Sequence, residues 1–219
     1  MKLSLRSLLY DLVFHEKCPV CNGDSHFKYS PFCEFCWNKI EAFSSHRIVR
    51  GKFYNDFWNY IVSLNSFGAY EGLLKEAIHC FKYGGIKRVG RELGKLLASI
   101  TPPKIDLLIP VPLHINKLRK REFNQSAILA KQCADAWKIP LSLTLLIKVK
   151  ETKDQASLEA RDRHSNVKNA YKVTGLMKGI KVGLVDDVVT TGATLMECAK
   201  TLKKAGIKEV HAITLARAI

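Results

Sequence analysis

The chain has 219 residues, 47% of them hydrophobic, with 35 lysine and arginine residues against 20 aspartate and glutamate residues. This length suffices for one well-packed domain with a small module, and it excludes two full-sized domains. No run of about 18 or more apolar residues occurs, which excludes a membrane-spanning helix. The formal net charge of +15 indicates attraction to polyanions such as nucleic acid, although solubility or small anionic ligands could also explain it.

The N-terminal segment, residues 1–14, combines apolar side chains with Lys2, Arg6 and Asp11. Its apolar run is interrupted and no small-residue cleavage site follows. The segment therefore predicts a short amphipathic helix rather than a signal peptide, and we expect a cytoplasmic protein.

Two C-x-x-C pairs, Cys18 with Cys21 and Cys33 with Cys36, follow and are separated by eleven residues. This is the spacing of a tetrahedral four-thiolate zinc site. Redox pairs are the alternative, but thioredoxin-type motifs come singly, at a helix N-terminus beside a strand. A closed four-thiolate site leaves no position for substrate, so we predict a structural zinc site, and whether it also touches DNA stays open. Because residues 1–60 offer little aliphatic core, we expect them to form a small metal-stapled module.

Residues 61–219 predict a second domain in which helices and strands alternate. Helical periodicity predicts helices from Tyr70 to Gly84 and over residues 89–100, 123–137 and 193–205. Short apolar runs predict strands at 105–111, within 141–149, at 180–185 and at 209–215. Residues 150–168 are polar and predict a loop with some helix. This alternation predicts an α/β fold with a parallel sheet covered on both faces.

The three isolated cysteines, Cys80, Cys133 and Cys198, lie in segments of helical periodicity. An odd number of cysteines without a signal peptide argues against a disulfide framework. We expect all three to be small core residues.

The strongest functional signal is residues 184–195, where a predicted buried strand leads through two adjacent acids into a threonine-rich helix start. Ligands of open α/β sheets bind beyond the carboxyl ends of strands, and a helix N-terminus offers amide hydrogens to phosphate. Two neighbouring carboxylates suit the vicinal hydroxyls of a ribose. A threonine helix cap beside solvated acids is the alternative, but a cap needs only one threonine. We therefore predict a site for a phosphorylated ribose, formed by Asp186, Asp187, Thr190, Thr191, Gly192, Ala193 and Thr194.

This segment resembles the phosphoribosyl pyrophosphate (PRPP) motif of type I phosphoribosyltransferases. The order of further blocks resembles the ComF family of competence proteins. These blocks are the cysteine pairs, Pro110-Val-Pro-Leu113, Arg119 to Arg121, Phe123-Asn-Gln125, Gln155-x-x-Leu158, Arg161, Asn166-Val167 and Leu215-Ala-Arg217. The resemblance implies a type I phosphoribosyltransferase fold over residues 61–219, with a parallel sheet flanked by helices, behind an N-terminal four-cysteine zinc-finger module over residues 1–60.

The resemblance also implies two loops around the ligand. A pyrophosphate loop would comprise Val111, Pro112, Leu113 and His114, although Pro110 and Pro112 could simply end a strand. A hood loop would span residues 150–166, with Gln155, Arg161 and Arg163 as candidate closing groups, although each arginine could be a solvated surface charge. No dedicated general base is evident, so no residue is assigned as catalytic. Glu122 stands where the family usually has glycine, and Lys148 and Lys150 stand where arginine is commoner.

Three functions fit these features. The first is a competence factor that binds PRPP or a related phosphate with Mg²⁺, binds single-stranded DNA and aids DNA uptake into the cytoplasm. The family role also implies a helicase or channel as partner, and a place at the inner face of the membrane. The second is an active phosphoribosyltransferase of nucleotide salvage, and the third is a regulator that senses PRPP without turnover. The candidate nucleic-acid contacts are Lys117, Arg119, Lys120 and Arg121.

Overall fold

The computed structural model describes residues 17–25, 31–41, 53, 56–84, 86–152, 165–175 and 177–218. The helix expected over residues 1–14 lies outside these ranges, and so does most of the expected hood loop. Among the helices that the structure describes, none combines the length and the hydropathy that a bilayer-spanning segment needs.

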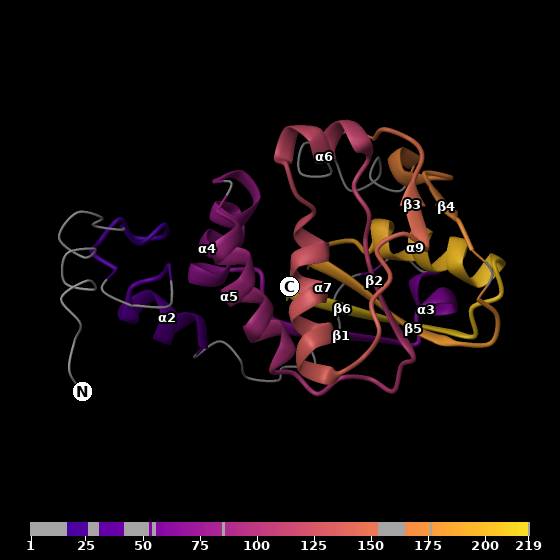
Figure 1. The fold of residues 1–219 in the computed structure, drawn as a ribbon, viewed down its shortest axis with the longest axis horizontal. Coiled ribbons are helices and arrows are strands. Elements are labelled where there is room, and N and C mark those ends of the chain that lie inside the picture. The colour runs from indigo at the N-terminus through magenta and orange to yellow at the C-terminus, as the bar shows by residue number, and fades with distance from the viewer. Residues whose placement is uncertain are drawn as a thin grey trace.

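Four parallel strands form the central sheet (Figure 1). Their spatial order is β1-β6-β5-β2, with bounds Ser63–Ala69 for β1, Leu107–Pro110 for β2, Lys181–Val189 for β5 and Glu209–Arg217 for β6. The central strands β5 and β6 are buried along most of their length, as expected for apolar strands covered on both faces. A separate antiparallel pair joins β3 (Leu146–Lys148) to β4 (Tyr171–Val173).

Helices cover both faces of the sheet, as Figure 1 shows. On one face α5 (Lys87–Ala98) packs beside α7 (Gln125–Trp137), and on the other α3 (Phe57–Tyr60) packs beside α9 (Ala193–Lys204). Successive residues of β5 contribute to the hydrophobic cores on opposite faces of the sheet, because side chains alternate along a strand. Val185 joins the core of α5 and α7, whereas Leu184 joins the core of α9. The predicted α/β architecture is therefore confirmed.

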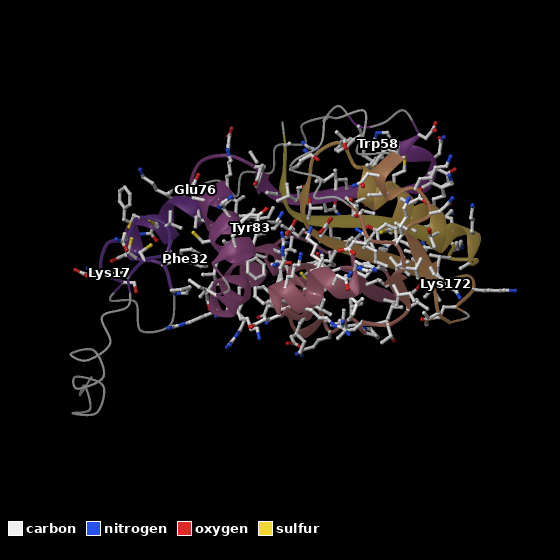
Figure 2. The ribbon with its side chains drawn as sticks, turned by 90° about the horizontal axis from the view of Figure 1, so that it is seen from above. Lys17, Phe32, Trp58, Glu76, Tyr83 and Lys172 are labelled. Atoms are coloured by element: carbon white, nitrogen blue, oxygen red, sulfur yellow. The ribbon has the colours of Figure 1, made fainter. Side chains whose placement is uncertain are left out.

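The helix α4 (Gly72–Tyr83) lies between the sheet domain and the cysteine module (Figure 1). It ends just before Gly84, the glycine at which the sequence predicted its end. Phe32 of the cysteine module is fully buried in the same core cluster as Ile78 and Phe81 of α4, and α2 (Glu34–Glu41) also contacts α4. Figure 2 shows Phe32 on the side of the module that faces this helix. The division at residue 60 stays a prediction.

Several predicted boundaries differ from those in the structure by a few residues, and two of the differences have a clear physical cause. The strand expected over residues 180–185 continues to Val189, because its last residues keep pairing with β6. The helix expected from residue 123 begins at Gln125, because the side chain of Asn124 accepts a hydrogen bond from the Ser126 amide and caps it.

Five short elements of the described chain were not predicted: the strands β1 and β4 and the helices α2, α3 and α6 (Ile115–Arg121). β1 is an edge strand in which Phe67 alone is buried, so its sequence lacks the apolar run that marks a buried strand. α6 buries none of its residues and so carries no apolar periodicity. Such elements form because neighbouring segments hold them in place.

The isolated cysteines divide into two classes. Cys133 and Cys198 are fully buried, as predicted for small core residues. Cys80 is only partly buried, and its thiol donates a hydrogen bond to the Pro19 carbonyl at 2.9 Å. The core prediction is therefore wrong for Cys80, whose thiol lies at the contact between α4 and the cysteine module.

Candidate functional site

The four paired cysteines converge on one point. The sulfur atoms of Cys18, Cys21, Cys33 and Cys36 all lie within 4.8 Å of one another, and Cys21 Sγ lies 3.6 Å from Cys33 Sγ. A tetrahedron of Zn–S bonds of about 2.3 Å has sulfur–sulfur separations of about 3.8 Å. The donor set and its spacing therefore fit a tetrahedral thiolate site that could hold a metal such as zinc.

The backbone around these cysteines favours thiolates. The Gly23 amide donates to Cys21 Sγ at 3.4 Å, and the Cys36 amide donates to Cys33 Sγ at 3.5 Å. Burial opposes ionisation of Cys18, but backbone hydrogen bonds lower its thiol pKa to about 7. Burial and the neighbouring sulfurs raise the pKa of Cys36. Several thiolates gathered this closely repel one another, and a bound cation removes that repulsion.

The two adjacent acids lie in the last part of β5, and two helices hold them. Asp186 Oδ1 accepts hydrogen bonds from Ser126 Oγ of α7 and from the Asp187 amide, both at 2.9 Å. Asp187 Oδ1 forms an ion pair with Lys82 Nζ of α4 at 2.8 Å. The acid pair, Asp186 with Asp187, is thus fixed by contacts from segments far apart in the sequence.

These contacts give the two acids different electrostatic surroundings. Burial raises the pKa of Asp186 to about 7, and the charge of Asp187 adds to the rise, while Lys82 and the Ser126 hydrogen bond oppose it. For Lys82, burial lowers the pKa, but the charge and hydrogen bond of Asp187 outweigh this and raise the pKa above its ordinary value. Lys82 therefore stays charged at neutral pH, whereas Asp186 is harder to ionise than an ordinary aspartate.

No side chain caps the N-terminus of α9, so its first backbone amides are left uncapped. Its N-cap is Gly192, in the left-handed region with φ of 80°, and no side chain caps the helix there. A Cβ at this position would approach the Phe57 ring to 2.6 Å, so only glycine fits. The threonines thus do not act as an ordinary cap. Thr191 Oγ1 is buried without a hydrogen-bond partner among the described residues, and Thr191 does not line the cavity that Thr190, Gly192, Ala193 and Thr194 line.

A cavity of about 380 Å³ joins the acid pair to the start of α9. It is also lined by Val111, Pro112 and Leu113, which follow β2, and by Lys117 and Arg121 of α6. Gln125 Nε2, from the same lining, is buried and lacks a partner within the described part of the chain. Carboxylates, a helix N-terminus and cationic side chains in one cavity suit a ligand that carries both hydroxyl and phosphate groups.

The structure places the other predicted site residues as follows. His114 lies outside the cavity lining, and its Nδ1 accepts a hydrogen bond from the Asn116 amide at the start of α6. Arg119 and Lys120 are exposed on α6. Gln155, Arg161 and Arg163 lie outside the described residues.

Sequence reasoning missed several residues around the cavity, among them Lys82, Tyr83 and Ser126. Lys82 and Tyr83 close α4, and Ser126 begins the first turn of α7. Tyr83 is more than half exposed, and the Arg121 guanidinium lies over its ring at 5.2 Å. In Figure 2 Tyr83 projects from α4 toward the middle of the molecule. No local sequence signal marks these residues, because only tertiary packing brings them to the acid pair.

The comparisons match the chain to a phosphoribosyl transferase domain and to competence and DNA utilization proteins. The family model for the phosphoribosyl transferase domain matches residues 124–219. Competence protein F of Haemophilus influenzae is 30% identical over 228 aligned positions, covering 94% of this chain and 98% of that protein. The DNA utilization protein YhgH of Salmonella typhi is 30% identical, covering 74% of each chain. Competence protein ComFC of Bacillus subtilis is 29% identical, covering 68% of this chain and 61% of that protein.

Among solved structures, the chain is similar to glutamine phosphoribosylpyrophosphate amidotransferase from B. subtilis complexed with ADP and GMP. The identity is 25%, and the match covers 56% of this chain and 25% of that one, with a TM-score of 0.39.

The cysteine geometry predicts one zinc ion per chain. We expect Cys33→Ser to lose the metal and to lower the melting temperature, because the remaining thiolates cannot complete a tetrahedron. Elemental analysis and thermal denaturation measure both effects. Cys80→Ser is the matched control, since its thiol lies outside the cluster, and it should keep the metal. A full metal content in the Cys33 variant would contradict the assignment.

The raised pKa of Asp186 predicts a pH-dependent stability. Between about pH 4 and about pH 7 the unfolded chain has lost this proton while the folded chain still holds it, so the unfolding free energy falls as pH rises. One such group contributes at most about 1.4 kcal/mol per pH unit. Asp186→Asn removes this titrating group. The unfolding free energy of the variant minus that of the wild type should therefore increase with pH up to about 7 and then level off. Urea unfolding across this pH range tests it, and a constant difference would refute it.

Proposed function

The chain belongs to the ComF family of competence proteins, and on that premise we propose that it binds PRPP with Mg²⁺, binds single-stranded DNA and aids DNA uptake into the cytoplasm. A role in competence comes with the family. The ligand and the DNA contact are the specific parts of the proposal, and each rests on a different part of the structure.

The observation that carries the ligand is the acid pair beside the start of α9. A carboxylate accepts hydrogen bonds from hydroxyl groups, and two neighbouring carboxylates match the 2′ and 3′ hydroxyls of a ribose. The amides and threonine hydroxyls at the start of α9 match the 5′-phosphate. The residues after β2, with Lys117 and Arg121, line the side of the cavity that suits a pyrophosphate.

Mg²⁺ bound with PRPP would neutralise charge on the pyrophosphate. The protein's own residues do different work. They orient the ribose through the acid pair and bind the 5′-phosphate through α9, and the cavity shields the ligand from water. This arrangement supports binding as well as turnover, so an active phosphoribosyltransferase is the alternative function, favoured by the match of the phosphoribosyl transferase domain.

The proposed DNA surface combines basic and aromatic side chains. The last turn of α6 carries Arg119, Lys120 and Arg121, and Arg121 stacks on the exposed ring of Tyr83. Single-stranded nucleic acid binds to surfaces that combine cationic side chains for the backbone with aromatic rings for the bases. Because Arg121 and Tyr83 also line the cavity, this surface adjoins the mouth of the ligand site.

The ligand is tested by Asp187→Asn. We expect PRPP affinity to fall by about tenfold or more, because an ionised acceptor for a ribose hydroxyl is lost. Calorimetric titration with Mg²⁺ present measures the change, and circular dichroism checks that the fold is intact. Asp135→Asn, at an exposed position on α7, is the control and should bind as the wild type does. Equal affinity in the Asp187 variant would remove the ribose assignment, and base-dependent release of pyrophosphate by the wild type would favour the enzyme alternative.

The DNA surface is tested by the double variant Arg119→Ala and Lys120→Ala. If both contact phosphates, affinity for single-stranded DNA should fall, and the salt slope should drop by about 1.4, since each contact contributes about 0.7. Fluorescence anisotropy at several salt concentrations measures both quantities. The control is Lys172→Ala with Lys178→Ala, two exposed lysines away from the cavity; Figure 2 shows Lys172 at the far end of the molecule. A fall of equal size in the control would show that only net charge matters.

A further inference from the structure

The ion pair between Lys82 and Asp187 differs from the other lysine ion pairs in the described chain. The Lys82 side chain is 20% exposed and that of Asp187 is 11% exposed, whereas the lysines of the others are at least 37% exposed. An exposed pair contributes little, but a pair withdrawn from solvent interacts strongly. The Lys82 ammonium is therefore a fixed charge of the cavity rather than a surface feature.

The positive charge of Lys82 lies beside the acid pair, where a site for a phosphorylated ribose requires a cation. The acid pair brings up to two negative charges into the cavity, and a phosphorylated ligand brings more. Lys82 pairs directly with Asp187 and also acts on Asp186 through its charge. A cation beside the acids removes much of the repulsion that a phosphate would otherwise meet there.

The ion pair can persist while a ligand binds. Lys82 contacts Oδ1 of Asp187, and a carboxylate has two oxygens with about four acceptor positions, so a hydroxyl can still donate to it. The ammonium has three N–H groups, of which the Asp187 contact uses one. Lys82 can therefore hold the acid and contact a ligand oxygen at the same time.

We propose that Lys82 is the built-in cation of the ribose site, which lets a ribose 5-phosphate group bind to the acid pair without a divalent metal ion. The inference rests on the proposed ligand site and adds the source of its positive charge. Mg²⁺ would then be needed only when the ligand also carries a pyrophosphate.

Ribose 5-phosphate is the probe that separates these roles, because it has the hydroxyls and the 5′-phosphate but no pyrophosphate. We expect wild-type protein to bind it with affinities in EDTA and in Mg²⁺ that agree within about threefold. Lys82→Met should bind about tenfold or more weakly in EDTA, because the charge-assisted contact is gone. Added Mg²⁺ should restore part of that loss, since a metal ion can take the vacated place beside the acids.

Two further variants control for the fold and the charge. Lys82→Arg keeps the charge, so in EDTA it should bind more tightly than Lys82→Met. Lys75→Met removes an exposed lysine from the same helix and should bind as wild type does. Calorimetry measures affinity, and thermal denaturation checks folding. The comparison of wild type in EDTA and in Mg²⁺ is informative even if Lys82→Met fails to fold.

The outcomes separate the inference from the proposed function. Wild-type binding that requires Mg²⁺ would overturn the inference and leave the ligand site intact. Unchanged binding by Lys82→Met in EDTA would overturn it too, and tighter binding would show that Lys82 blocks the site instead. Absence of wild-type binding under both conditions would overturn the proposed ribose site, and the inference with it.

Discussion

The acid pair is the constraint on which the candidate site depends. Two consecutive carboxylates near the end of a buried strand repel one another and lose solvation, so they need partners from outside the strand. Lys82 comes from the end of α4 and Ser126 from the first turn of α7. The positions of these two helices are thus tied to the chemistry of β5, and the cavity forms where the three elements meet.

The helix α4 connects three features within four residues. Cys80 donates to the Pro19 carbonyl of the cysteine module, Lys82 pairs with Asp187, and Tyr83 stacks under Arg121. Successive residues of a helix point in different directions, so one short segment reaches the module, the ligand cavity and the basic surface. The cysteine module therefore supports the helix that supplies the site with its lysine and its exposed ring.

Sequence reasoning identified the candidate residues where the chemistry is local. The β5–α9 segment and the two cysteine pairs carry their signals within a few residues, and the structure gathers the four thiols and sets the acids beside the start of α9. It failed where packing decides. The edge strand β1 lacks an apolar run, β5 runs on to Val189 because β6 continues beside it, and nothing near Lys82 in the sequence indicates that it pairs with Asp187.

The claim that the acid pair recognises a ribose is tested most directly by comparing ribose 5-phosphate with 2-deoxyribose 5-phosphate in calorimetric titrations of the wild-type protein. The two ligands differ by one hydroxyl and share the phosphate. If a carboxylate of the pair accepts that hydroxyl, the deoxy ligand should bind about tenfold more weakly, because a charge-assisted hydrogen bond is lost. Equal affinities would mean that the 2-hydroxyl is not recognised, and would contradict the assignment of Asp186 and Asp187 to the vicinal hydroxyls of a ribose.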